Sequence, residues 1–216
     1  MKRFVVRALI VVVATLGIVF AQVAPASATA SDKLANDLAA LWTNVLETPS
    51  DLNPFGTGGE DFACIDIGGR TVSPFAGGEE FTCTVEPRTK LFVVGFSFEC
   101  STFDDDCGRE TQPDGCKGTT APELLDCARE LDVKEAPGVT VDGKSVTVTE
   151  VEVPKLKIVL PDDNIFGEPA GTRGVSAAHG WVTLLDPLTP GIHTIEITDS
   201  DGNLLNTTTI VVTPGH

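Results

Sequence analysis

Six cysteines constrain the fold of this 216-residue chain more than any other feature, because all of them lie between Cys64 and Cys127. An even number of cysteines within a short stretch predicts disulfide bonds in a protein that reaches an oxidising compartment. Six cysteines allow many pairings, and the local context of each cysteine favours one scheme. Cys64 and Cys83 lie on successive strand-like segments, so we expect them to pair.

The remaining four cysteines surround an acidic segment. Cys100 ends a long apolar strand and Cys127 points inward from a predicted helix, so we expect a bond that joins strand to helix. Cys107 and Cys116 then close the loop between them. Each of these bonds should stabilise the fold by roughly 2–4 kcal/mol.

The N-terminus has the layout of a secretory signal peptide. Basic residues precede an apolar run over residues 8–20, and small residues follow it. This layout predicts a signal peptide over residues 1–28, with cleavage after Ala28 or Ala30. The apolar run is shorter than the roughly 20 residues that span a bilayer. We therefore expect a secreted, extracellular or cell-envelope-associated protein with no membrane span after signal removal; retention of the signal as an anchor is the alternative.

The chain is strongly acidic, with a formal net charge of −16 at pH 7. Nucleic acid is excluded as a partner, because phosphate binding requires clustered Lys and Arg side chains. The expected partner is an extracellular protein or polymer, and no motif indicates a cofactor.

Helical periodicity and a following proline predict a helix over residues 31–48. A second helix is predicted after Thr120, which forms a T-x-x-E capping box with Glu123.

Short β-rich segments dominate the single domain expected over residues 49–216. Residues 90–100 read as a central strand, and two hairpins are predicted around the turns Asp142-Gly143 and Asp201-Gly202. The fold class that follows is mainly β, an antiparallel β-sandwich of immunoglobulin or jelly-roll type with two short packed helices.

Candidate functional residues are few. His179, Trp181 and Asp186 are the candidate ligand-facing residues, but no nucleophile motif accompanies them and no catalytic residue is assigned. No zinc motif is present, and the run Asp104, Asp105 and Asp106 is a weak calcium candidate. The absence of tyrosine argues against a sugar-binding face, because sugars stack on Trp and Tyr rings.

Several segments together resemble a family of exported bacterial proteins with no established activity. They are the Cys-Thr-Val strand at 83–85, the Glu-Cys strand end at 99–100, the Asp-Asn-Ile-Phe-Gly turn at 163–167, Gly-Trp at 180–181 and the strand at 188–195. His179 departs from the family pattern, which has aspartate there. The resemblance implies export, one β-rich domain and the bond between Cys100 and Cys127, and it implies no reaction.

The closing hairpin separately resembles the last two strands of bacterial immunoglobulin-like modules. Such a likeness concerns the fold alone. We therefore predict a non-enzymatic binding or structural protein of the cell exterior. One alternative is an extracellular hydrolase that uses carboxylates or His179, and a second is a weak calcium-dependent adhesion module.

Overall fold

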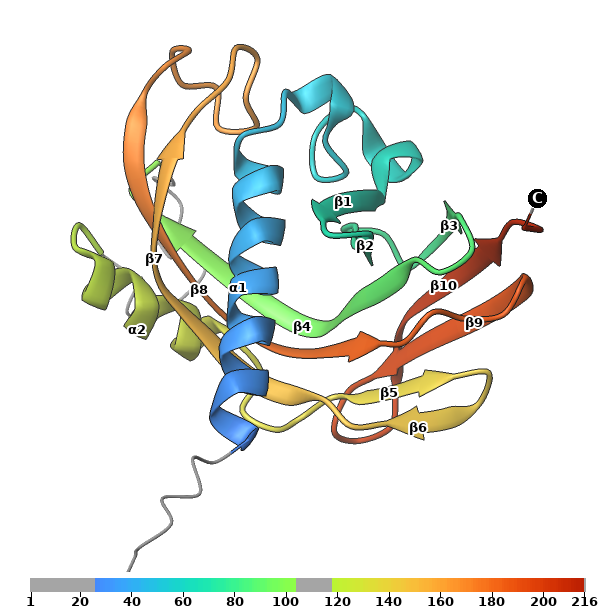
Figure 1. The fold of residues 1–216 in the computed structure, drawn as a ribbon. Helices are drawn as coiled ribbons and strands as arrows, with labels where there is room; N and C mark the ends of the chain where they lie inside the picture. Colours follow the sequence, from blue (N-terminus) through green and yellow to red (C-terminus); the bar gives the residue numbers. More distant parts are fainter. Residues whose placement is uncertain (1–25, 104–117, 216) are drawn as a thin grey trace, which may run out of the picture.

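The computed structural model describes residues 26–103 and 118–215. Within these residues the chain forms two five-stranded sheets and two α-helices (Figure 1), which confirms the predicted mainly-β sandwich. The helices are α1 (Ala26–Leu46) and α2 (Ala121–Leu131), and short 3-10 helices span Ser50–Leu52 and Gly59–Phe62.

Sheet A has the strand order β1-β2-β4-β8-β7. Its strands are β1 (Cys64–Gly68), β2 (Thr71–Pro74), β4 (Lys90–Ser101), β7 (Thr149–Val159) and β8 (Arg173–Leu185). As predicted, β4 is a central strand, paired with β8 over its length. The edge strand β7 carries Pro154 at a register shift between Val153 and Leu156, where the missing N–H of proline is tolerated.

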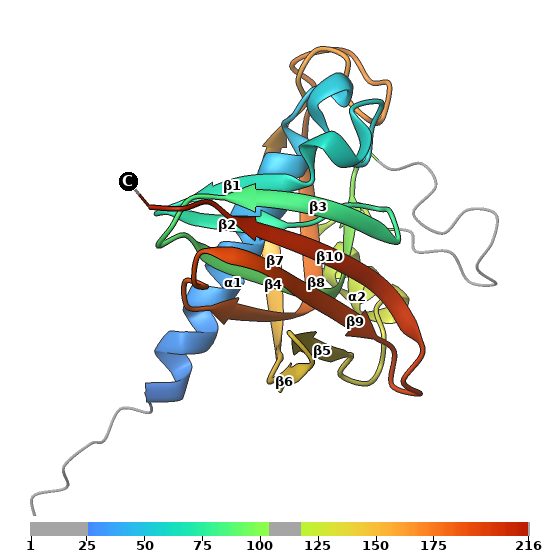
Figure 2. The same ribbon diagram turned by 90° about the vertical axis from the view of Figure 1, so that its right-hand side faces the viewer.

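Sheet B has the strand order β3-β10-β9-β5-β6, and Figure 2 shows β3, β10 and β9 side by side. Its strands are β3 (Glu80–Val85), β5 (Gly138–Val141), β6 (Lys144–Val146), β9 (Gly191–Thr198) and β10 (Leu204–Val212). Both predicted hairpins are present, and the turn at Asp142 and Gly143 has the two positive φ angles, 50° and 73°, that a type I′ turn requires.

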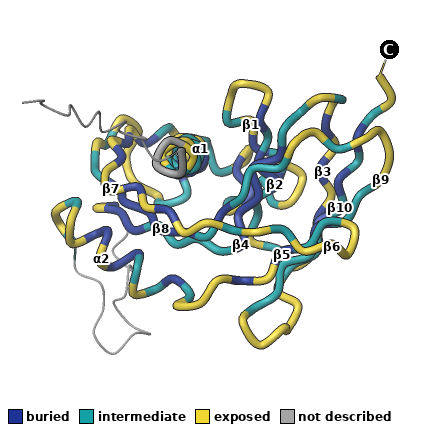
Figure 3. Tube along the Cα trace, turned by 60° about the horizontal axis from the view of Figure 1, so that its bottom comes forward, coloured by how far each residue is buried: buried dark blue, intermediate teal, exposed yellow. Residues whose placement is uncertain are grey.

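The two faces of sheet A have different cover, which follows from the alternation of side chains along β4. Phe92 and Val94 pack against α1, whereas Leu91 and Val93 pack against sheet B. Further along the strand, Cys100 joins the cluster beneath α2. Figure 3 shows α1 and α2 on opposite sides of the layer formed by β7, β8 and β4. One face of sheet A therefore belongs to α1, and sheet B and α2 share the other.

The capping box of α2 is formed as predicted. The Glu123 carboxylate accepts hydrogen bonds from the backbone N–H groups of Thr119 and Thr120, each at 3.0 Å. These bonds, above all the one from Thr119, lower the pKa of Glu123. In the helix that follows, the side chains of Leu124, Leu125, Cys127 and Ala128 are buried. The cap therefore begins the helix at a residue from which these side chains face β4 and β8.

The predicted disulfide between Cys64 and Cys83 is confirmed. It joins β1 of sheet A to β3 of sheet B, with the two Cα atoms 5.3 Å apart. Its loop of 19 residues in sequence separation corresponds to about 3 kcal/mol of stabilisation through the unfolded chain. The bond therefore staples the two sheets at one edge.

The second predicted pairing differs from the structure. Cys127 takes part in a disulfide bond, but the structure does not bond it to Cys100. Both residues lie buried in the cluster between β4, β8 and α2. Inward orientation alone does not give the Cβ alignment that a disulfide needs. The predicted pairing of Cys107 with Cys116 falls on residues outside the described part of the chain.

Two further features of the fold differ from expectation. The sheets are not purely antiparallel, because β2 runs parallel to β4 and β3 runs parallel to β10. Both parallel pairs arise because the chain changes sheet, between β2 and β3 and again between β3 and β4. The N-terminal helix runs over Ala26–Leu46 rather than 31–48, so the predicted cleavage after Ala28 or Ala30 falls in its first turns.

Candidate functional site: an aromatic cavity beside β4

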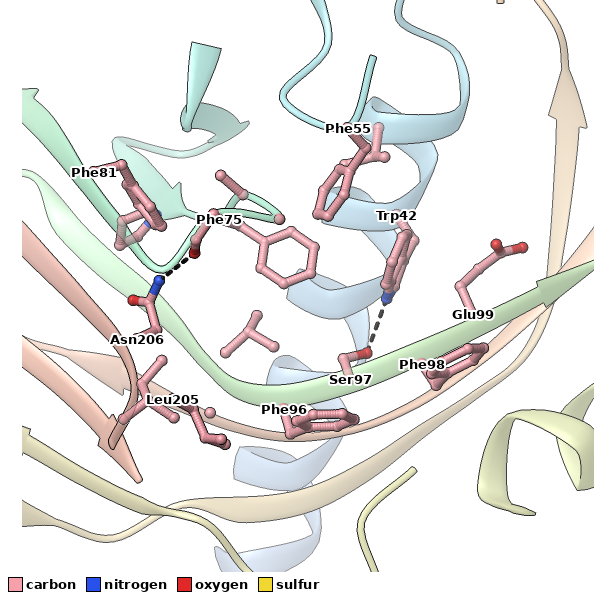
Figure 4. A pocket seen from close by; sticks show the side chains of 18 of the residues that line it. Trp42, Phe55, Phe75, Phe81, Phe96, Ser97, Phe98, Glu99, Leu205 and Asn206 are labelled. Atoms are coloured by element: carbon pink, nitrogen blue, oxygen red, sulfur yellow. Dashed lines mark hydrogen bonds between the residues drawn. The ribbon is translucent and has the colours of Figure 1, made fainter. Parts of the chain in front are cut away.

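A cavity of about 560 Å³ lies between α1, the middle of β4 and the β10 end of sheet B (Figure 4). Its walls include six of the eleven phenylalanines and one of the two tryptophans of the chain. Pockets of about 300–1,000 Å³ with apolar walls and a few polar groups are typical of ligand sites. The cavity is therefore the candidate functional site.

Three rings from three separate segments form one wall. Trp42 comes from α1, Phe55 from the loop after α1, and Phe75 from the residue after β2. The Trp42 and Phe75 ring centroids lie 5.4 Å apart in an edge-to-face arrangement, and Phe55 and Phe75 lie 5.1 Å apart. Such pairs hold aromatic walls in fixed orientations.

The polar edge of Trp42 is fixed by β4. The indole Nε1–H donates to Ser97 Oγ at 3.0 Å, and the Ser97 hydroxyl donates to the carbonyl oxygen of His179 at 2.7 Å. This chain of bonds orients the indole so that its ring face borders the cavity (Figure 4).

A register shift at Gly95 makes this geometry possible. The shift lies between Val94 and Phe96 in the pairing of β4 with β8, and it brings Ser97 to the α1 face that Val94 occupied. A Cβ at Gly95 would stand 2.8 Å from the side chain of Pro137. Glycine is thus required where β4 bends past sheet B.

The opposite wall belongs to sheet B. Asn206 donates from Nδ2 to the carbonyl oxygen of Gly78 at 2.8 Å, and its Oδ1 accepts from Thr208 Oγ1 at 2.9 Å. Leu205 stands beside it at the rim with 39% of its surface exposed. Phe81 completes this side.

Charge is scarce in the cavity. Glu99 is the one ionisable side chain among the described lining residues, and its Oε1 accepts a hydrogen bond from Ser176 Oγ. The walls therefore offer ring faces, methyl groups and a few fixed polar atoms, which suits an uncharged apolar ligand.

The sequence-predicted candidates lie elsewhere: none of His179, Trp181 and Asp186 lines the cavity. Trp181 Nε1 donates to the carbonyl oxygen of Val133 at 3.4 Å. Asp186 is exposed beyond the end of β8. The structure does not bring Asp186 and His179 together, since His179 is enclosed by other carboxylates.

His179 belongs to a polar cluster beneath α2. Its Nδ1 lies 2.6 Å from Asp132 Oδ2 and its Nε2 lies 3.0 Å from Glu150 Oε1. Burial raises the pKa of Asp132, against the opposing effect of the hydrogen bond to His179. Because both ring nitrogens contact carboxylates, this cluster ties the end of α2 to β7 and β8.

Asp104, Asp105 and Asp106, the weak calcium candidates, lie outside the described residues. Within residues 26–103 and 118–215, no group of three or more His, Cys, Asp or Glu side chains is arranged to hold a metal ion. In the same part of the chain, no helix combines the length and apolarity needed to cross a bilayer.

No protein-family model, curated protein or solved structure matches this chain. The cavity itself is therefore the observation from which a function can be argued.

Sequence reasoning missed the cavity. Its lining comes from α1, three loops, β2, β3, β4, β9 and β10, and such phenylalanines look like core residues in sequence. One signal was available, because the chain has eleven phenylalanines and no tyrosine. That composition points to aromatic surfaces without hydroxyl groups, which the cavity displays.

Proposed function

We propose that this protein is an exported, non-enzymatic binding protein that holds an uncharged apolar ligand, or the uncharged apolar part of a larger ligand, in the aromatic cavity. The observation that carries the proposal is the cavity itself, with seven aromatic side chains and a single ionisable one among its described lining residues. Export is supported by the signal-like N-terminus and by the disulfide between Cys64 and Cys83.

The mouth of the cavity favours entry of an apolar group. Leu205 and Phe55 both line the cavity and are both 39% exposed. Exposed apolar side chains at the rim of a concave apolar site are typical of binding surfaces. A ligand that covers them gains roughly 25 cal/mol for each Å² of apolar surface removed from water.

Electrostatics favours an uncharged ligand over an anionic one. A carboxylate or phosphate would find no cation among the described lining residues, and it would meet Glu99 and a net charge of −16. Burying an unpaired charge is costly. Fatty acids and phosphorylated ligands are therefore disfavoured.

The hydrolase alternative has less support. Both ring nitrogens of His179 are hydrogen-bonded to carboxylates, which leaves neither one to activate a nucleophile. The calcium alternative rests on Asp104, Asp105 and Asp106, which lie outside the described residues.

The test is titration of the protein with N-phenylnaphthylamine, an uncharged dye that fluoresces in apolar surroundings. Leu204 and Leu205 provide a matched pair, because both are exposed leucines of β10, at 57% and 39%, but Leu205 alone lines the cavity. We expect Leu205→Glu to weaken dye binding about tenfold, since a charge beside an apolar ligand costs about 1–3 kcal/mol. Leu204→Glu should leave the affinity within about twofold. Absence of dye binding, or equal effects of the two variants, would refute the proposal.

A further inference from the structure

From Phe92 to Phe98, the second edge of β4 has no partner strand among the described residues. On one side β8 pairs with β4 from Leu91 to Ser101. On the other side, β2 pairs only with Lys90 and Leu91. Beyond Leu91, no described strand pairs with β4 on that side. An open strand edge is a template for another extended chain.

The cavity reaches this edge. Six consecutive residues of β4, from Val94 to Glu99, line it. A cavity above one face of a strand is lined by alternate residues, because neighbouring side chains point to opposite faces. Beyond the register shift at Gly95, four residues in turn, Phe96 to Glu99, line the cavity. Lining by consecutive residues means that the cavity extends around the strand edge. In Figure 4 the labelled side chains Ser97 and Phe98 leave opposite faces of β4 beside the same space.

Hydrogen bonds identify which backbone groups face the edge. The Thr102 N–H donates to the carbonyl oxygen of Val175 at 2.9 Å, so Thr102 directs its backbone groups toward the β8 side. Since this direction alternates along an antiparallel strand, Phe98 also turns to β8. The backbone N–H and C=O of Ser97 point to the opposite edge, where the cavity lies.

Acidic side chains flank the same space. Glu79 and Glu80 are exposed and lie between the lining residues Gly78 and Phe81. A partner that carries basic residues beside an apolar stretch is complementary to this rim.

We propose that the occupant of the cavity is an extended polypeptide segment of a partner protein, which adds as a strand to the open edge of β4. Its alternate apolar side chains enter the aromatic cavity, and flanking Lys or Arg residues meet the acidic rim. Strand addition of this kind combines main-chain hydrogen bonds with side-chain pockets. The inference rests on the proposed function, since it names the class of ligand for the same cavity.

The test uses the full chain and the hexapeptide acetyl-Lys-Val-Phe-Val-Phe-Lys-amide as a probe that displaces bound N-phenylnaphthylamine. A series of peptides carries one N-methyl group at each successive central residue. We expect methylation at every second position to weaken binding about tenfold, because it removes a hydrogen-bond donor directed at β4. Methylation at the intervening positions should change affinity by about twofold or less. Replacement of both Lys residues by Glu should also weaken binding about tenfold.

The outcomes separate this inference from the proposed function. Dye binding without displacement by the peptide would overturn the strand-addition inference and leave the proposed function standing. A methylation series without the period of two would also overturn the inference, because the peptide would then bind only as an apolar body. If the dye is displaced as the protein concentration rises, a second copy of this chain binds at the edge of β4. That result would also overturn the inference. Failure of the dye itself to bind would overturn both proposals.

Discussion

The two sides of sheet A are built differently around the same strands. Beneath α2, the polar side chains contact one another. His179 lies between Asp132 and Glu150 and contacts both. Arg129 forms two hydrogen bonds to the Glu152 carboxylate, at 2.7 and 2.8 Å. Beside α1, the sheet ends in an aromatic cavity whose walls include a single ionisable side chain among the described residues. The region beneath α2 is therefore held together by charged and polar side chains, whereas the region beside α1 contains a cavity with apolar walls.

Because of this difference, the candidate binding site lies among apolar side chains and not among the titratable ones. His179, which the sequence suggests as a candidate catalytic residue, helps to hold α2 in place through its contacts with Asp132 and Glu150. Six phenylalanines that the sequence suggests as core residues line the cavity instead.

Replacement of Asp132 by alanine should cause the largest loss of stability. The Asp132 side chain is 0% exposed, and its removal leaves the buried His179 without its closest partner. Breaking a buried pair on one side costs about 3–5 kcal/mol, which urea unfolding would detect. The dye affinity should stay unchanged, because neither Asp132 nor His179 lines the cavity.

Asp126→Ala is the matched control for that variant. Asp126 lies on the same helix and pairs with Arg129 at 2.7 Å, but its side chain is 70% exposed. Its loss should cost at most about 0.5 kcal/mol. Equal losses of unfolding free energy in the Asp126 and Asp132 variants would contradict this prediction. A change in dye affinity with Asp132→Ala would show that the cluster beneath α2 and the cavity are not independent.

Two phenylalanines of nearly equal exposure test whether the dye binds in the cavity. Phe55 is 39% exposed and lines the cavity, whereas Phe62 is 38% exposed and does not. Phe55→Ala should weaken dye binding about tenfold, through the loss of roughly 1–2 kcal/mol of apolar contact. Phe62→Ala should change the affinity by about twofold or less. Similar effects in both variants would mean that the dye binds to exposed apolar side chains in general.

The smallest effect concerns the pair formed by His193 and Asp142 in sheet B. His193 Nδ1 lies 2.8 Å from Asp142 Oδ2, and Nε2 donates to the carbonyl oxygen of Thr189. The bond to Asp142, then the bond to Thr189, raises the pKa of His193, and the bond from His193 lowers the pKa of Asp142. The contribution of His193 is thus fully present below its ordinary pKa of 6.5 and is lost as pH rises through the raised value. The contribution of Asp142 is present above 3.8 and is lost as pH falls through the lowered value.

Proton NMR of the His193 ring measures this coupling directly. The midpoint should lie above 6.5 and should fall in Asp142→Asn, because the amide no longer favours the charged ring. An unchanged midpoint in Asp142→Asn would show that the pair has no such coupling. Dye affinity should not follow this titration, since neither residue lines the cavity.

Local features of the fold were predictable because they depend on neighbouring residues. The capping box at Thr120 and Glu123 and the turn at Asp142 and Gly143 each follow from the backbone needs of a few adjacent residues. The long apolar run of β4 likewise indicated a central strand.

The sequence did not indicate which strands lie next to each other in the two sheets. The segment after the Asp142-Gly143 turn read as one arm of a hairpin, but it divides into β6 of sheet B and β7 of sheet A. An alternation of period two predicts a strand and does not say which strand lies beside it. The cavity depends on such choices, because it exists where β2 leaves β4 and β3 joins β10. Its rings come together only through that topology.

Energy transfer from Trp42 to bound N-phenylnaphthylamine tests directly whether the ligand occupies the cavity. Trp42 lines the cavity and Trp181 does not, so Trp181→Phe leaves a chain whose single tryptophan reports on the site. We predict that Trp42 emission falls as dye fluorescence rises, with one common midpoint that Leu205→Glu shifts about tenfold. A rise in dye fluorescence with unchanged Trp42 emission would place the ligand elsewhere and contradict the account.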